Sequence, residues 1–234
     1  MNSQINLKNF LLFLVPKEKQ KLPEDFSFHY EVIRNLKQQF QNDITLLIDT
    51  CLCSITPDGH CGISRKKKID LKQTHYALGL AANTYLEAGA DIIAPSDMMK
   101  NTTKYLKKTI GINGFIDAPI MSYSSKFKSN LYGPFREAAK SSPKGFDRSS
   151  YQLPVNDRER AIKSSINNAA QGADYLMVKP GMTSIDLIAD IKSNTLLPTG
   201  VYQVSGEYAS MTLLNKEKLG DYGDNQIFYC NIRT

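Results

Sequence analysis

The chain has 234 residues, of which 41% are hydrophobic and 22% charged, with ten prolines and fourteen glycines. These values are ordinary for a globular protein and exclude general disorder and collagen-like repeats, while four cysteines in a chain of this length argue against a disulfide scaffold. The net charge of +6 comes mostly from lysines that are not interleaved with aromatic residues, so we expect a solvated basic surface and no nucleic-acid partner.

Short apolar runs alternate with longer amphipathic segments along the chain. The runs expected to form strands are 10–15, 44–48, 91–94, 114–120, 175–178 and 201–204. The segments expected to form helices are 30–40, 70–87, 98–108, 157–170 and 184–192. Near-continuous apolar strands followed by helix-length segments indicate a parallel sheet covered by helices. The first apolar run is too short for a signal sequence or a membrane span, so we expect a cytoplasmic protein without membrane association.

A repeated join favours a barrel over an open sheet. Segments 88–95 and 171–180 both carry a glycine suited to a helix end, then an apolar run, then a proline that ends the strand. The glycine-rich motifs of nucleotide-binding open sheets do not occur. We therefore expect an α/β fold of the TIM type, a (β/α)8 barrel of which about six βα units are recognisable, with residues 1–234 forming one domain.

Three cysteines follow the strand expected at 44–48. Cys51, Cys53 and Cys61 lie within eleven residues of one another, beside a turn-forming Pro-Asp-Gly sequence. Thiolates are strong zinc ligands, and a site with three protein ligands leaves one position open for water or substrate. The alternative is that they are packed cysteines without a metal. We interpret the cluster as a metal site, in which His60 is either a further ligand or a loop residue.

Two lysines follow other strands of the expected barrel. Lys179 ends the strand at 175–178, where burial in an apolar barrel mouth would lower its pKa and make it a nucleophile toward a carbonyl group. Lys126 follows the strand expected to end at Ile120. If both lysines face one mouth, each charge lowers the pKa of the other. Each could instead be a protonated lysine in solvent. Together with the cysteines, they predict a site that handles carbonyl compounds.

A segment rich in Ser, Gly and Pro, residues 141–152, predicts a mobile lid. Arg136 precedes it and Arg148 lies within it, and two guanidinium groups suit the bidentate binding of a substrate carboxylate. Two surface arginines would give the same pattern. After the last expected strand, residues 203–208 place a hydroxyl and a carboxylate, Ser205 and Glu207, at the same mouth.

Several of these motifs together resemble one known family. They are the cysteine cluster and the segments 94–99, 121–127, 131–139, 172–180 and 202–208. Segment 172–180 is similar to the Schiff-base signature of the porphobilinogen synthase (5-aminolevulinate dehydratase) family. The resemblance to this family runs from about residue 32 to residue 211. It implies a lyase that condenses two molecules of 5-aminolevulinate to porphobilinogen, with loss of two waters, in tetrapyrrole (haem) biosynthesis.

The resemblance also implies a role for individual residues. Lys179 would hold the first substrate as a Schiff base, and Lys126 would engage the second. The implied ligands of Zn²⁺ are Cys51, Cys53 and Cys61. The residues implied to bind or line the substrates are Asp49, Tyr132, Phe135, Arg136, Arg148, Gln152 and Ser205.

The chain departs from the family pattern near its ends. The second βα unit and the N-terminal arm of family members have no counterpart, which bears on the family's octamer, although a homo-oligomer is still expected. The last unit is curtailed, and Tyr229 is a candidate for the tyrosine that helps Ser205 hold a carboxylate.

Smaller departures lie inside the motifs. Residues 100–102 replace the usual Asp-Gly-Arg, and Gly145-Phe146 stands where the family has Phe-Gly. Ser164 stands where magnesium-responsive members carry a glutamate, so we expect no allosteric magnesium there. Three hypotheses therefore follow: a working zinc-dependent synthase, an inactive remnant that keeps the site residues, and a zinc-binding interaction module.

Overall fold

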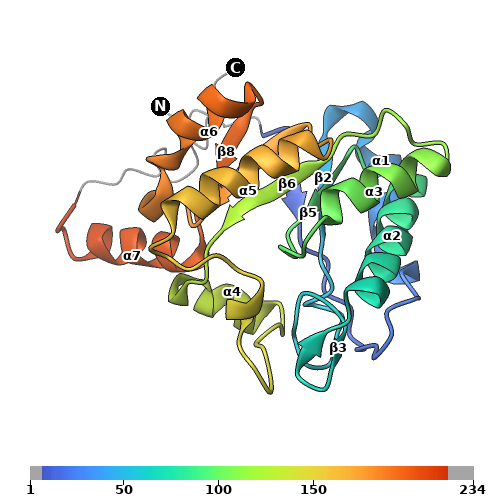
Figure 1. The fold of residues 1–234 in the computed structure, drawn as a ribbon, viewed down its shortest axis with the longest axis horizontal. Helices are drawn as coiled ribbons and strands as arrows, with labels where there is room; N and C mark the ends of the chain where they lie inside the picture. The colour runs from blue at the N-terminus through green and yellow to red at the C-terminus, as the bar shows by residue number, and fades with distance from the viewer. Residues whose placement is uncertain (1–6, 221–234) are drawn as a thin grey trace.

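The computed structural model describes residues 7–220, and its main feature is a row of parallel strands in chain order (Figure 1). The first half of the row pairs β1 (Asn9–Leu12), β2 (Thr45–Thr50) and β5 (Ile92–Pro95). The second half pairs β6 (Met121–Lys126), β7 (Tyr175–Lys179) and β8 (Thr199–Val201). One bridge between Ile93 and Ile120 joins the halves. Parallel strands in chain order are the arrangement of a TIM-type barrel, so the expected α/β class is confirmed.

Helices cover the outer face of this row. They are α1 (Ser27–Phe40), α2 (Leu71–Glu87), α3 (Thr102–Ile112), α5 (Arg158–Ala170) and α6 (Leu187–Thr195). Side-chain caps mark two of the starts, because Asp70 accepts a hydrogen bond from the Gln73 amide and Asp157 accepts one from the Arg160 amide. Helices α1, α2 and α3 pack in sequence on one half, and α5 packs on α6 on the other (Figure 1). Two helices were not expected from the sequence: α4 (Gly133–Ala138) and α7 (Ser205–Lys216).

The prediction of a strand at residues 114–120 is wrong. That segment is a turn and an extended approach, and the strand is β6, which begins at Met121. Three serines made β6 resemble a loop, yet all six of its residues are buried. The serine hydroxyls are satisfied by α5: Ser124 Oγ lies 2.7 Å from Ser165 Oγ, and Ser125 Oγ donates to the Ala161 carbonyl at 2.7 Å. A polar strand is therefore compatible with burial here.

The described part of the barrel is open between β1 and β8. Neither of these strands has a partner on its outer edge among residues 7–220. A cavity of about 630 Å³ lies along this opening. Its walls include Leu11 and Leu47 on one side and Tyr175, Met177 and Tyr202 on the other. The fold thus agrees with the expectation of an incomplete barrel.

The chain between β2 and α2 leaves the barrel as a loop and a short hairpin. The hairpin pairs β3 (Ser64–Arg65) with β4 (Lys68–Ile69), and Lys66 and Lys67 form its turn with positive φ angles of 50° and 61°. The cysteines belong to the loop before it. Among the described residues, no helix combines the length and the apolar character that a membrane crossing needs.

Candidate active site

Two lysines lie side by side at the carboxyl ends of β6 and β7. Lys126 and Lys179 are register partners on these neighbouring strands, and both side chains are buried, at 5% and 4% exposure. Lys126 Nζ donates a hydrogen bond to the Ser96 carbonyl at 2.5 Å. Lys179 Nζ lies 4.0 Å from the ring centroid of Tyr202, and no described carboxylate forms an ion pair with it. The structure thus brings both lysines to one mouth, the carboxyl ends of β6 and β7 around the two amines, an arrangement that the sequence left open.

Aromatic rings form the walls around the Lys179 amine. Ring centroids lie within 5.2–5.7 Å of Nζ for Phe13, Tyr123, Tyr132 and Phe135. Phe13, Tyr123 and Tyr202 were not among the expected site residues. Phe13 and Tyr202 lie inside expected strands and Tyr123 lies just beyond one, but aromatic residues at such positions are equally suited to an ordinary core.

Burial sets the charge state of the mouth. Desolvation, followed by the nearby charge of Lys126, lowers the pKa of Lys179 to about 7. Asp49, near the end of β2, has its pKa raised to about 6, because burial outweighs the opposing charges of Lys126 and Lys179. Asp49 Oδ1 is buried without a hydrogen-bond partner. The mouth therefore combines an amine that is half neutral near pH 7 with a carboxylate that can accept a hydrogen bond.

The three cysteines lie together beside this mouth. Their sulfur atoms lie within 4.8 Å of one another, and all three side chains are buried. Zinc–sulfur bonds of about 2.3 Å in a tetrahedral site place sulfur atoms about 3.8 Å apart, so a small contraction would fit this donor set to zinc. Hydrogen bonds from Cys51 and Cys53 lower the pKa of Cys61 well below its usual value, whereas the pKa values of Cys51 and Cys53 are raised. A metal bound here would therefore displace the protons of those two thiols.

His60 is not part of this set of ligand atoms. It is fully buried, and its ring stacks on Phe146 with centroids 3.7 Å apart. Both of its ring nitrogens face groups of the lid segment, Tyr151 Oη at 3.0 Å and the Lys144 carbonyl at 3.2 Å. Of the two interpretations of His60, the loop residue fits the structure.

Arg148 and Gln152 in the lid segment are buried and incompletely satisfied. Arg148 Nη2 donates to the carbonyls of Gly59 and Ser141 at 2.8 and 2.6 Å, while its Nε has no hydrogen-bond partner. Both polar atoms of the Gln152 amide also have none. Buried polar groups are normally hydrogen-bonded, so such a concentration indicates groups that await a polar ligand.

Arg136 lies on the short helix α4 and is half-buried. Its Nη2 donates to the Ser129 carbonyl at 3.3 Å, and its buried Nε has no partner. The guanidinium lies 5.4 Å from the ring centroid of Tyr132. Tyr132 in turn donates to the Phe127 carbonyl at 2.6 Å. The Arg136 side chain is therefore oriented by the same segment that forms a wall of the mouth.

Ser205 and Glu207 begin helix α7, and they have different roles. Ser205 Oγ accepts a hydrogen bond from the Phe135 amide at 3.1 Å, so it joins α7 to α4. Glu207 does not offer a free carboxylate to the mouth. It is buried and accepts hydrogen bonds from four backbone amides, those of Gly181, Met182, Thr183 and Val204. Tyr229 lies outside the described residues.

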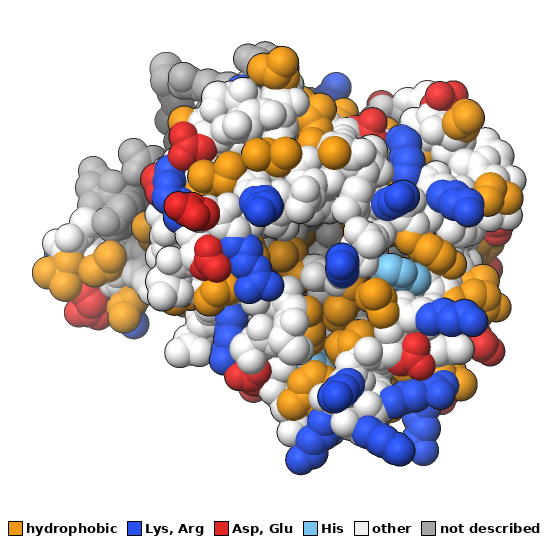
Figure 2. All heavy atoms as spheres, viewed as in Figure 1, with side chains coloured by type: hydrophobic (Ala, Val, Ile, Leu, Met, Phe, Trp, Pro, Cys, Tyr) orange, Lys and Arg blue, Asp and Glu red, His pale blue; other side chains and the backbone are white. Residues whose placement is uncertain are grey.

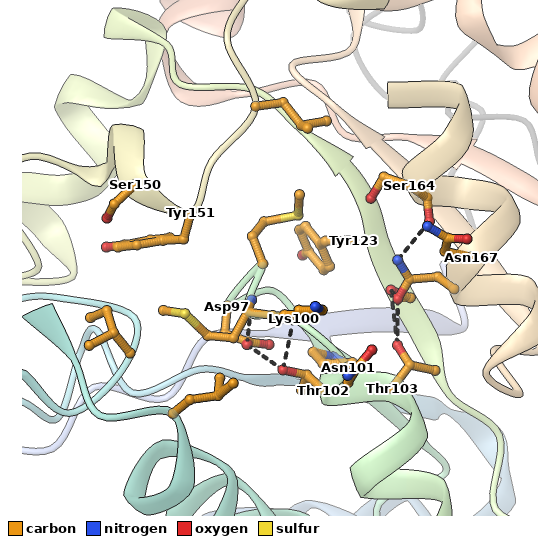
Figure 3. A pocket seen from close by; sticks show the side chains of 18 of the residues that line it. Asp97, Lys100, Asn101, Thr102, Thr103, Tyr123, Ser150, Tyr151, Ser164 and Asn167 are labelled. Carbon is orange, nitrogen blue, oxygen red and sulfur yellow. Dashed lines mark hydrogen bonds between the residues drawn. The ribbon is translucent and has the colours of Figure 1, made fainter. Parts of the chain in front are cut away.

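A second cavity of about 630 Å³ lies outside the barrel wall, between α3, α5 and the β3–β4 hairpin (Figure 3). Asp97 is buried in it and accepts hydrogen bonds from the Met99 amide and the Thr102 hydroxyl, and burial raises its pKa to about 7. The basic side chains of its lining are Lys67, Lys68, Lys100, Arg160 and Lys163. Lys and Arg side chains border this hollow in Figure 2, and none of the five forms an ion pair within the described chain.

Comparison with known proteins identifies the family. The sequence model of the family described as "Delta-aminolevulinic acid dehydratase" matches residues 2–228, which is nearly the whole chain. The chain belongs to the delta-aminolevulinic acid dehydratase family. The resemblance found in the motifs is thereby confirmed.

Individual members of the family show the same relationship. The chain is 38% identical over 222 residues to the dehydratase of Helicobacter pylori, a match that covers 93% of this chain and 68% of the relative. It is 46% identical over 167 residues to that of Escherichia coli K12, covering 71% and 51%. The crystal structure of the Toxoplasma gondii enzyme, determined with its reaction product porphobilinogen, superposes with a TM-score of 0.86 at 33% identity, covering 91% and 62%.

The matches also define how much of a family member this chain represents. It spans between about half and two thirds of the length of these relatives. The described fold corresponds to a large part of a dehydratase barrel, with the opening between β1 and β8.

Proposed function

We propose that the chain condenses two molecules of 5-aminolevulinate to porphobilinogen, with loss of two waters, as a lyase of tetrapyrrole biosynthesis. The observation that carries the proposal is the pairing of Lys126 with Lys179 in one buried mouth, beside three clustered cysteines and the unsatisfied groups of Arg148 and Gln152. Family membership supports the same reaction.

Lys179 is the residue suited to form the first covalent bond. With a pKa of about 7, half of its amines are neutral at that pH and can add to the ketone carbon of 5-aminolevulinate. Formation of the carbon–nitrogen double bond releases the ketone oxygen as water. Lys126 would engage the second substrate in the same mouth. Both lysines leave their substrates as the pyrrole forms, so the two waters account for the two ketone oxygens and neither lysine is consumed.

The charged groups around the mouth suit substrates that carry an amine and a carboxylate. Arg136, Arg148 and Gln152 would bind the carboxylate of the second substrate, because the Nε of each arginine and the Gln152 amide nitrogen are buried donors without a partner. Ser205 would donate to the carboxylate of the first. Asp49 would hold the amine of the second substrate through the oxygen that is now unpartnered. Tyr132 and Phe135 would exclude water from the Lys179 amine.

The cysteine cluster would hold Zn²⁺ through Cys51, Cys53 and Cys61. When bound, zinc supplies a Lewis acid that polarises a substrate group or activates a water. The ring nitrogens of His60 are already hydrogen-bonded to the lid, so we do not include it among the ligands.

Porphobilinogen formation by the purified chain tests the proposal. We expect product from 5-aminolevulinate and zinc, less product after chelation, and none from Lys179→Met. Lys72→Met serves as the matched control, because Lys72 is an exposed lysine of α2. Turnover that survives Lys179→Met would contradict the assignment.

One observation favours a second candidate, the inactive remnant. The unpaired outer edges of β1 and β8 leave the described barrel open beside the mouth. A chain that melts cooperatively and binds zinc but yields no porphobilinogen would support this candidate over the working synthase.

A further inference from the structure

We propose that His60 is a positioning residue that couples metal occupancy of the cysteine cluster to closure of the lid over the substrate-binding groups. The lid is residues 141–152, which carry Arg148 and Gln152. The inference rests on the proposed role of the cysteine cluster as a metal site.

A continuous chain of hydrogen bonds runs from Cys61 to Tyr151 of the lid, from Tyr151 to His60, and from His60 to Lys144, so that His60 joins two points of the lid beside the cysteine. The Cys61 amide donates to Tyr151 Oη at 3.4 Å, and Tyr151 Oη lies 3.0 Å from His60 Nδ1. His60 Nε2 lies 3.2 Å from the Lys144 carbonyl. A carbonyl can only accept, so Nε2 carries the proton; Nδ1 then accepts from the Tyr151 hydroxyl, whose oxygen accepts from Cys61. One tautomer of His60, with the proton on Nε2, satisfies every group in this chain of hydrogen bonds.

The imidazole ring itself is held by the lid. His60 is fully buried, and its ring is nearly parallel to that of Phe146, with an interplanar angle of 12°. Figure 3 shows the Tyr151 ring with its hydroxyl directed away from Tyr123. His60 is therefore enclosed by one ring and two polar groups of the lid.

The backbone on either side of His60 also meets the lid. The Lys144 amide donates to the Asp58 carbonyl at 2.8 Å, and Arg148 Nη2 donates to the Gly59 carbonyl at the same distance. A Cβ atom on Gly59 would lie 2.5 Å from the Ser142 carbonyl oxygen, so only glycine permits this approach. Residues 58–60 thus form the surface on which the lid rests.

These contacts make lid closure depend on the position of Cys61. A metal bound to Cys61 fixes the residue directly after His60. It thereby also restrains the carbonyls of residues 58 and 59, which accept the hydrogen bonds from Lys144 and Arg148. Without metal, this loop has one fewer constraint, and the lid loses part of its support. Metal binding would therefore favour the closed lid and the orientation of Arg148 and Gln152 toward a carboxylate.

Tryptic cleavage of the full chain measures the coupling without relying on turnover. The lid and its flank offer cleavage sites after Lys140, Lys144 and Arg148. We expect saturating zinc to slow cleavage at these sites by roughly tenfold in the unmodified chain, because cleavage tracks the open population. In His60→Ala, zinc should still bind at one ion per chain, measured by titration against a chromophoric chelator, but should protect the lid much less, because only the backbone contacts of residues 58–61 then meet the lid.

Three further variants separate coupling from general loss of structure. His75→Ala is the matched control, because His75 is also stacked on a ring, Tyr105, but lies outside the lid contacts. It should keep the full zinc protection. His60→Gln, which retains a donor and an acceptor, should restore part of the protection. Phe146→Leu removes the ring that stacks on His60 from the lid side, so it should also reduce the zinc protection. It tests the same contact in case His60→Ala does not fold.

The possible outcomes are distinct. Equal zinc protection in the unmodified chain, His60→Ala and Phe146→Leu would overturn the coupling while leaving the metal site intact. Loss of zinc binding in a folded His60→Ala chain would show that His60 is a ligand and would also overturn it. An unmodified chain that binds no zinc would refute the metal site in the proposed function, and the coupling with it.

Discussion

Lys126 and Lys179 are paired in the register of two neighbouring parallel strands, and their amines therefore enter one buried mouth. The consequence is electrostatic. Burial and the charge of Lys126 lower the pKa of Lys179 to about 7, more than three pH units below an ordinary lysine at 10.5. The strand register thus prepares a nucleophile whose reactivity should change within the physiological pH range.

Trapping of 5-aminolevulinate by Lys179 should depend on pH around neutrality. The amine is protonated and unreactive below its pKa, so the initial rate of trapping, measured with a reductant such as cyanoborohydride, should rise with pH and reach half its maximum near pH 7. The rate must be corrected for the pH dependence of the reductant with a free amine. A midpoint near pH 10 would show that Lys179 is an ordinary solvated lysine.

Two substitutions should move this midpoint in opposite directions. Lys126→Met removes a positive charge that lowers the pKa of Lys179, so the midpoint should rise. Asp49→Asn removes a negative charge that raises it, so the midpoint should fall. Lys72→Met, at an exposed lysine of α2, should leave it unchanged. Shifts of the same sign for Lys126→Met and Asp49→Asn would mean that the two groups do not act on Lys179 through their charges.

The close approach of the lid to Gly59 should make the free energy of unfolding sensitive to a side chain at this position. Gly59 and Gly114 both have positive φ angles, 69° and 92°, but only a Cβ on Gly59 would meet another atom within 4 Å. Alanine at either position costs the strain of a left-handed backbone. Gly59→Ala should lower the free energy of unfolding in urea by about 1–3 kcal/mol more than Gly114→Ala, the matched control. Equal effects would mean that the lid does not rest on this loop.

Glu207 should matter for stability rather than for chemistry. Its buried carboxylate accepts from four backbone amides, three of them in the turn after Lys179, and its removal would leave those donors without a partner. We expect Glu207→Ala to lower the free energy of unfolding by about 3 kcal/mol. Glu217→Ala, at an exposed position near the end of α7, is the control and should change it by less than about 0.5 kcal/mol. A thermal or urea melt of both variants checks this.

The sequence predicted the architecture where hydrophobicity and periodicity agree. Five of the expected strand segments overlap or adjoin β1, β2, β5, β7 and β8, because each is a short apolar run. It failed at β6, where buried serines are satisfied by α5, a long-range pairing that local patterns do not reveal. The helix α7 was missed because its start depends on Glu207, whose partners lie both at the helix start and in the turn after β7.

The site could be predicted only in part. The cysteine cluster and the two lysines were found because unusual residue types occur at strand ends, and the structure brings them together. The link between His60 and the lid could not be predicted, since it joins residues about 90 positions apart. The substrate-binding roles, the single-domain organisation, the homo-oligomer and the cytoplasmic location stay predictions.

Locating the covalent adduct tests most directly whether Lys179 begins the condensation. The full chain, incubated with 5-aminolevulinate at pH 8 and reduced with borohydride, is digested and its peptides are analysed by mass spectrometry. We expect the first molecule to be trapped on Lys179, in the peptide that contains β7, and Lys179→Met to abolish this adduct. Trapping on other lysines with Lys179 unmodified would contradict the central claim that this buried amine begins the condensation.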